Sequence, residues 1–184
     1  MCRATRRIVG IDIDYKSSSM TADLLTLLRR DHDELGRALA VMVEPRSSDR
    51  DLCDAIGSVH LGLAVHTEAE RAMLRAALES AHPPGSVYEL CAQVVGAHLS
   101  QERALASLDN ARRGTAAWRE LAAQLRSLFD HHDEHEFAQV IPALRESLSN
   151  EAYGALAGSY ASARLRALGT VPIALIFEDD VDLS

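Results

Sequence analysis

The sequence has few aromatic residues, no long hydrophobic run and no excess of positive charge. Aromatic residues make up 4% of its 184 residues, although hydrophobic residues as a whole make up 47%. Because β-sandwiches depend on aromatic and β-branched residues, this composition argues against an all-β fold. No apolar run approaches the length of about 18 residues that a membrane span requires. Lysine and arginine total 19 against 27 aspartates and glutamates, so neither nucleic acid nor an anionic membrane surface is an expected partner.

The sequence also lacks a cysteine framework. Its three cysteines are Cys2, Cys53 and Cys91, and no two of them form a CxxC motif. An odd number of scattered cysteines is typical of a reducing compartment, so we expect a cytoplasmic protein. The apolar stretch that follows the N-terminal arginines is short and contains Asp12 and Asp14, which argues against a signal peptide.

The sequence divides into a leader, one helical domain and a C-terminal segment. We interpret residues 1–20 as a flexible leader, with a short edge strand as the alternative. Residues 21–148 form the main domain. Residues 149–184 contain a further predicted helix over 150–168 and then an apolar tail with an acidic end. We expect this tail to pack on the domain and cover a hydrophobic groove; the alternative is a dimer contact, so the chain is a monomer or a homodimer.

Four segments of the main domain have apolar residues at steps of three and four, the pattern of amphipathic helices. They cover approximately residues 21–44, 49–81, 86–112 and 115–148. Thr115 and Ser86 are expected to cap the helices that they precede, and Pro142 should kink the last one. Long helices joined by short turns predict an all-α fold, an antiparallel up-and-down four-helix bundle with an additional C-terminal helix.

Each of the four helices interrupts its apolar stripe with polar side chains near its middle. The first helix has His32 alone, whereas each of the others has a histidine followed four residues later by a glutamate: His66 and Glu70, His98 and Glu102, His132 and Glu136. Residues four apart lie on one helical face. Because the middles of antiparallel neighbours lie at the same level, we expect all seven groups to converge inside the bundle.

Seven buried polar groups of this kind need a partner. An unpaired buried charge costs on the order of several kcal/mol, and three carboxylates would repel one another. Two cations would resolve the conflict, since carboxylates can bridge metals while imidazoles complete their coordination. Mixed imidazole and carboxylate ligands suit iron or manganese better than zinc. The alternative is that these are satisfied polar groups of the core, or that some helix faces are rotated outward.

The fourth helix leaves one choice of register. His131 and His135 are also four residues apart, and a small rotation would put them in place of His132 and Glu136. That rotation would lose a carboxylate from the site, so we favour His132 and Glu136. We expect His135 and the adjacent Glu134 to move protons at the mouth of the site.

Three segments carry a resemblance to a known family. They are LRRDHDEL at 28–35, HTEAE at 66–70, and HDEHE at 132–136 followed by IPAL at 141–144. They resemble, in that order, the first-helix signature and the two HxxxE motifs of the hemerythrin-like proteins with an HHE cation-binding domain. The resemblance covers about residues 21–148, and the combined spacing is specific although a single HxxxE would not be.

The resemblance implies a non-haem di-iron centre. Position by position, His32 and His66 would serve one iron and His98 and His132 the other, while Glu70, Glu136 and an oxo or hydroxo group would bridge them. The family's reversible oxygen carriers have a histidine where this sequence has Glu102. As a ligand, Glu102 would favour ferric iron and weaken oxygen carriage. Alternatively, Glu102 accepts a hydrogen bond from one of the ligands.

A carboxylate-rich di-iron centre suits oxidative chemistry. The expected activity is therefore catalase-like disproportionation of hydrogen peroxide, with ferroxidase activity as the neighbouring enzymatic interpretation. The alternative is reversible binding of oxygen, nitric oxide or iron by a carrier, store or sensor that performs no turnover. Each interpretation makes small molecules, namely hydrogen peroxide, oxygen and nitric oxide, the expected partners.

Overall fold

The computed structural model describes residues 23–81 and 83–170, and it contains helices and no strand within these ranges. The elements are α1 (Leu24–Val43), α2 (Asp49–Ala81), α3 (Gly85–Asp109), α4 (Ala116–His135), the π-helical turn η1 (Glu136–Val140), α5 (Ile141–Ser147) and α6 (Asn150–Thr170). Since α4, η1 and α5 follow without a break, they form one continuous rod. The expected all-helical class is confirmed. None of these helices is long and apolar enough to cross a membrane.

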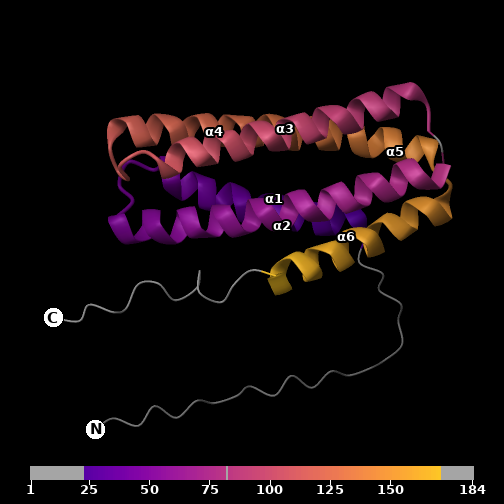
Figure 1. The fold of residues 1–184 in the computed structure, drawn as a ribbon, viewed down its shortest axis with the longest axis horizontal. Helices are drawn as coiled ribbons and strands as arrows, with labels where there is room; N and C mark the ends of the chain where they lie inside the picture. Colours follow the sequence, from indigo (N-terminus) through magenta and orange to yellow (C-terminus); the bar gives the residue numbers. More distant parts are fainter. Residues whose placement is uncertain (1–22, 82, 171–184) are drawn as a thin grey trace, which may run out of the picture.

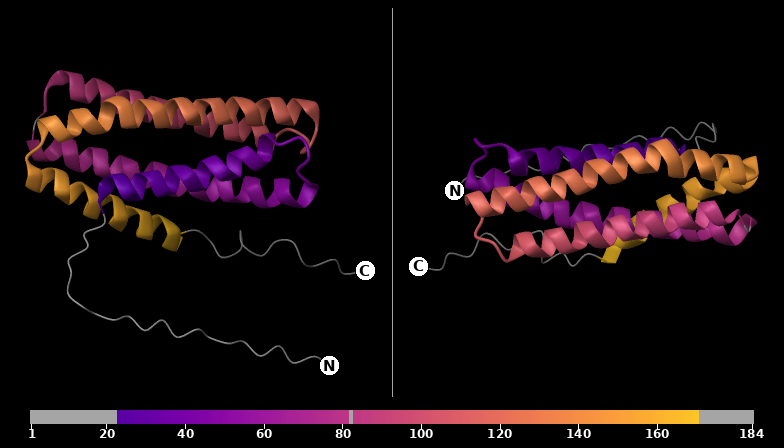
Figure 2. Two further views of the ribbon diagram at one scale, coloured as in Figure 1. Left: turned by 180° about the vertical axis from the view of Figure 1, so that it is seen from behind. Right: turned by 90° about the horizontal axis from the view of Figure 1, so that it is seen from above.

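Four rods lie side by side along the long axis of the molecule: α1, α2, α3 and the rod of α4 to α5 (Figure 1). Helix α1 packs against α2 and α4, and α3 packs against α4. Helix α6, the additional helix expected over 150–168, packs on the outside of α2 and α1 (Figures 1 and 2). The described residues therefore form a helical bundle with a fifth helix laid against one face.

The predicted leader, residues 1–20, lies outside the described residues. The apolar and acidic tail lies outside them as well, from residue 171 onward. The edge strand, the groove covering and the dimer contact considered above therefore all concern residues outside the described ranges.

Local sequence sets several helix ends. The Thr115 hydroxyl accepts a hydrogen bond from the backbone N–H of Trp118, so the predicted cap of this helix is confirmed. Helix α3 begins one residue before Ser86, with Pro84 at its N-cap position and no side-chain cap. The prediction that Ser86 caps this helix was wrong, because the chain is already helical there. Between α3 and α4, Gly114 has a φ of 76°, a conformation that costs glycine little.

The chain departs from regular α-helical geometry just before Pro142, and the departure is a π-helical turn. The backbone N–H of Ile141 donates to the carbonyl of Glu136, five residues earlier. A turn of this kind accommodates one extra residue and occurs frequently at functional sites. Glu136 is the first residue of η1, so the wide turn starts at a residue whose side chain is fully buried.

The apolar core is divided into two clusters. The first core cluster lies toward α5 and α6 and includes Leu28, Met73 and Leu144. The second core cluster lies toward the turn between α3 and α4 and includes Leu39 and Trp118. Between them the helices bury polar side chains: Asp31, His32, His66, Thr67, Glu70, His98, Gln101, His132 and Glu136. A polar layer therefore separates the two halves of the core.

Candidate metal centre

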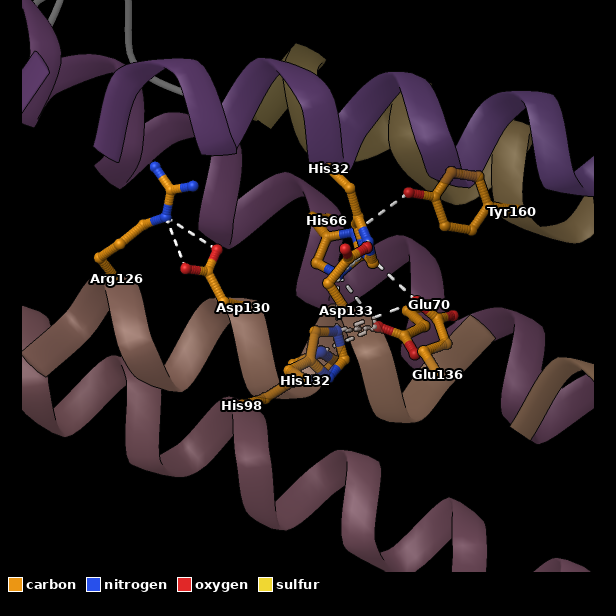
Figure 3. A network of polar contacts seen from close by, with 10 residues as sticks. All are labelled: His32, His66, Glu70, His98, Arg126, Asp130, His132, Asp133, Glu136 and Tyr160. Atoms are coloured by element: carbon orange, nitrogen blue, oxygen red, sulfur yellow. Dashed lines mark hydrogen bonds and ion pairs between the residues drawn. The ribbon is translucent and has the colours of Figure 1, made fainter. Parts of the chain in front are cut away.

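Four histidines meet in the polar layer, one from each of the helices α1 to α4 (Figure 3). His32 Nε2 lies 3.3 Å from His66 Nε2, which in turn lies 3.4 Å from His132 Nε2. The ring of His98 lies 4.8 Å from that of His132, measured between centroids. All four residues are at most 4% exposed. Four imidazoles thus present their nitrogens to one small volume that is shielded from solvent.

Glu70 reaches three of these histidines with a single carboxylate oxygen. Its Oε2 atom lies 2.9 Å from His98 Nε2, 3.1 Å from His66 Nε2 and 3.5 Å from His132 Nε2. His66 and Glu70 both come from α2, and their spacing of four residues places them on one face of this helix. The Glu70 carboxylate consequently links side chains from three helices.

Glu136 provides the second carboxylate. Its Oε2 atom lies 3.2 Å from His32 Nε2 and 4.0 Å from His132 Nε2, and its side chain is fully buried. Two groups of potential ligand atoms result, each with all its atoms within 4.8 Å of one another: His66, Glu70, His98 and His132; and His32, His132 and Glu136.

The two carboxylates have pKa values shifted in opposite directions. Burial acts to raise the pKa of Glu70, but the surrounding histidines lower it well below its usual range. Burial, together with the negative charge of Glu70, raises the pKa of Glu136 well above its usual range. Burial also lowers the pKa of His66 to about 4, so its imidazole is neutral at neutral pH. Without a cation, therefore, only one of the two carboxylates is stable in its charged form.

Several atoms of this cluster lie close to one another but form no hydrogen bond of acceptable geometry among the described residues. They are both carboxylate oxygens of Glu70 and of Glu136, Nε2 of His98 and Nδ1 of His132. Buried polar atoms without partners destabilise a fold, and native proteins contain few of them. A cation would use the free electron pairs of these carboxylates and imidazoles. The buried histidines and glutamates can therefore hold a metal ion.

Two of the histidines are held by a partner at the ring nitrogen that points away from the cluster. His32 Nδ1 contacts a carboxylate oxygen of Asp133. His66 Nδ1 lies 3.2 Å from the hydroxyl oxygen of Tyr160, and that hydroxyl donates to Asp31 at 2.7 Å. Burial and the charge of Asp31 raise the pKa of Tyr160, so the hydroxyl keeps its proton. A bond at Nδ1 leaves Nε2 free and directed at the cluster, the arrangement usual for histidine ligands of metals.

Asp31 ties this arrangement to α6. The Nε atom of Arg164 lies 2.9 Å from both carboxylate oxygens of Asp31, and Tyr160 and Arg164 both belong to α6. The fifth helix thus takes part in positioning His66. The sequence alone assigned no role to Tyr160 or Arg164, because nothing in the local sequence shows where α6 docks.

Glu102 is not brought into the cluster. Its side chain is exposed and belongs to neither group of potential ligand atoms. Gln101, one residue earlier, is fully buried instead. Helix α3 is rotated so that the third residue after His98, rather than the fourth, faces the interior. The structure thus places Glu102 neither as a metal ligand nor as a hydrogen-bond acceptor for one.

The fourth helix directs His132 and Glu136 inward. His131 is exposed, so the alternative register with His131 and His135 is not the one adopted. Glu134 is exposed as well, whereas His135 is partly buried and its Nε2 has no hydrogen-bond partner among the described residues. Burial lowers the pKa of His135. Neither His135 nor Glu134 belongs to the ligand groups, and their role in proton movement remains a prediction.

The chain shows no match to a family model, to a curated protein or to a solved structure. The candidate metal centre is therefore defined by its own geometry. That geometry consists of four buried imidazoles and two buried carboxylates, brought together from four helices.

Proposed function

We propose that this chain is a hemerythrin-like, non-haem di-iron protein whose bundle is antiparallel and up-and-down. The observation that carries the proposal is the pair of overlapping ligand groups, which share His132. Glu70 lies against three of the histidines and Glu136 against the fourth, as bridging carboxylates would. In this proposal His32, His66, His98 and His132 complete the coordination of the two irons.

The donor set favours iron over zinc. Structural zinc sites take four ligands in a tetrahedron and are dominated by cysteine and histidine. Here six side chains converge, and two of them are carboxylates that each have an oxygen within 4.0 Å of more than one histidine. Mixed nitrogen and oxygen donors in this number suit iron, or manganese as its nearest competitor.

The reaction that we propose is disproportionation of hydrogen peroxide. Two molecules of peroxide become two of water and one of oxygen; one peroxide loses two electrons and the other gains them, so no external reductant is needed. Bound iron would supply the two-electron redox capacity. The chain keeps bulk water away through burial and holds His66 neutral. Asp133 is 42% exposed and contacts His32, so its carboxylate can exchange protons with solvent beside the site.

Reversible binding of oxygen or nitric oxide is the second candidate. The exposed position of Glu102 favours it, because the argument that an anionic donor on α3 disfavours ferrous iron no longer applies. This candidate predicts a stable diferrous form that takes up the gas and releases it unchanged.

Metal analysis and peroxide turnover on the purified, iron-reconstituted protein test the proposal. We expect about two irons per chain and rapid oxygen release after peroxide is added. Two irons with no oxygen release would favour the gas-binding candidate, and absence of iron would contradict both. His66→Ala should abolish iron binding, whereas His60→Ala should not. The second change is the matched control, since His60 lies on the same helix but is exposed and paired with Asp109.

A further inference from the structure

Gln101 is a buried polar side chain with no hydrogen-bond partner among the described residues. It is fully buried, and both the oxygen and the nitrogen of its carboxamide lack a hydrogen-bond partner among the described residues. On α3 it follows His98 by three residues, and Ala104 of the second core cluster comes three residues later. Gln101 therefore lies between the histidines and the second core cluster.

The matching positions on the other three helices are apolar. Three residues from each histidine, on the side of the second core cluster, stand Leu35, Leu63 and Phe129. This layer is in contact with the candidate metal centre, because the ring of Phe129 lies 5.5 Å from that of His32. Gln101 completes the layer on α3 and is the one member of the four that can form hydrogen bonds.

Fold stability does not account for a glutamine at this position. A buried amide without partners destabilises a protein, whereas an apolar side chain of the same length would fill the space without that cost. The exposed neighbour Glu102 shows that polar residues are accommodated at the surface of this helix turn. The carboxamide therefore needs a partner that is not part of the described chain.

We propose that the Gln101 carboxamide hydrogen-bonds the small molecule on which the site acts, and that this molecule is hydrogen peroxide. The inference rests on the proposed function, and it names a residue that binds the substrate. A carboxamide offers both N–H donors and a carbonyl acceptor. Hydrogen peroxide can satisfy both, since it donates and accepts, whereas oxygen and nitric oxide have no hydrogen to donate. Of these three small molecules only peroxide can use both atoms of the amide, because the two gases can accept from its N–H but cannot donate to its carbonyl.

The test replaces the amide with an apolar side chain of similar length, Gln101→Met. In the iron-loaded protein we expect unchanged iron content and a KM for peroxide raised about tenfold or more, since hydrogen bonds to the substrate are lost. In the metal-free protein we expect a higher melting temperature, because a buried amide without partners has been removed. Glu102→Gln, one residue away and exposed, should change neither quantity.

Three results would overturn the inference. They are an unchanged KM, a lower melting temperature of the metal-free variant, which would make the amide structural, and loss of iron, which would make it a metal ligand. Gln101→Leu provides a second apolar variant in case Gln101→Met does not fold. A wild-type protein that holds iron but releases no oxygen would contradict the proposed function. An active wild type with an unaffected Gln101→Met variant would contradict only the role of Gln101.

Discussion

The two halves of the candidate metal centre differ in how their histidines are held. On α1 and α2, His32 is braced by Asp133 and His66 by Tyr160, each through Nδ1. On α4, Nδ1 of His132 has no hydrogen-bond partner among the described residues, and on α3 the amide of Gln101 has none either. The histidines of the first half are therefore oriented by protein contacts, whereas in the second half a histidine nitrogen and an amide remain without a partner.

This difference separates two tasks. Braced imidazoles need little reorganisation when they bind a metal, so the α1 and α2 half should govern how tightly metal is retained. Unpaired polar atoms destabilise the empty protein but become partners once a ligand arrives, so the α3 and α4 half should govern which small molecule binds. Substitutions and pH changes that affect both halves, or only one of them, test this division of tasks.

Removing Glu70 should have the largest effect, because its carboxylate contacts histidines of both halves. We expect Glu70→Ala to lose bound iron completely, as measured by metal analysis after reconstitution. The control is Glu68→Ala on the same helix, where the side chain is exposed and pairs with Arg71. If Glu70→Ala retained iron, Glu70 would not be a ligand shared by the two halves, and the expected ranking of effects would be wrong.

Acid should act on the braced half through His66. Burial lowers the pKa of His66 from 6.5 to about 4, so between these values the unfolded chain binds a proton that the folded chain does not. The stability of the metal-free chain is therefore fully present above pH 6.5 and should fall by about 3 kcal/mol as the pH approaches 4. Urea unfolding across this range measures the fall. His66→Gln should flatten the pH dependence of the free energy of unfolding, whereas His60→Gln, at an exposed site, should not. Equal pH dependence in the two variants would show that His66 does not cause the fall.

Removing the Tyr160 hydroxyl should loosen the braced half specifically. We expect Tyr160→Phe to weaken iron binding about tenfold, because His66 loses the partner that orients its ring. Competition with a chelator gives the affinity. Tyr153→Phe is the matched control: Tyr153 is buried on the same helix, but its ring lies against Arg145 and not against the cluster. Similar iron affinities in the two variants would show that α6 does not support the site.

Neutralising Asp133 should have the smallest effect. Its contact with His32 is partly open to solvent, because the Asp133 side chain is 42% exposed, and exposed ion pairs contribute little. We expect Asp133→Asn to weaken iron binding only about threefold in the same chelator competition. Asp130→Asn, which disturbs a surface pair with Arg126 on the same helix, should leave the affinity unchanged. An effect larger than that of Tyr160→Phe would reverse the expected ranking of the two braces.

Much of the site follows from helical spacing alone. His66 with Glu70, and His132 with Glu136, are each four residues apart, so each pair shares a face wherever its helix packs. The polar interruptions stand near the middle of otherwise apolar stripes, and that position indicates burial between two apolar clusters. The structure brings six of the seven expected residues together on this basis.

The choice between Glu102 and Gln101 shows where spacing becomes insufficient. The third and fourth residues after His98 lie about 60° and 40° to either side of it, so both positions are compatible with the same helical face. The rotation of α3 decides between them. Packing sets that rotation, since Ala104 and Leu105 join the second core cluster and turn Gln101 inward.

The sequence by itself determined the helices, their apolar stripes and the histidine and glutamate pairs, because these depend on the backbone period and on residues within one or two turns. Only the tertiary structure decided the rest. Tyr160 reaches His66 across 94 residues of chain, and Asp133 reaches His32 across 101. No local pattern encodes such contacts, because they require helices to dock in one particular rotation and register. The position of α6 and the rotation of α3 thus determine which histidines are braced and which amide is left for a ligand.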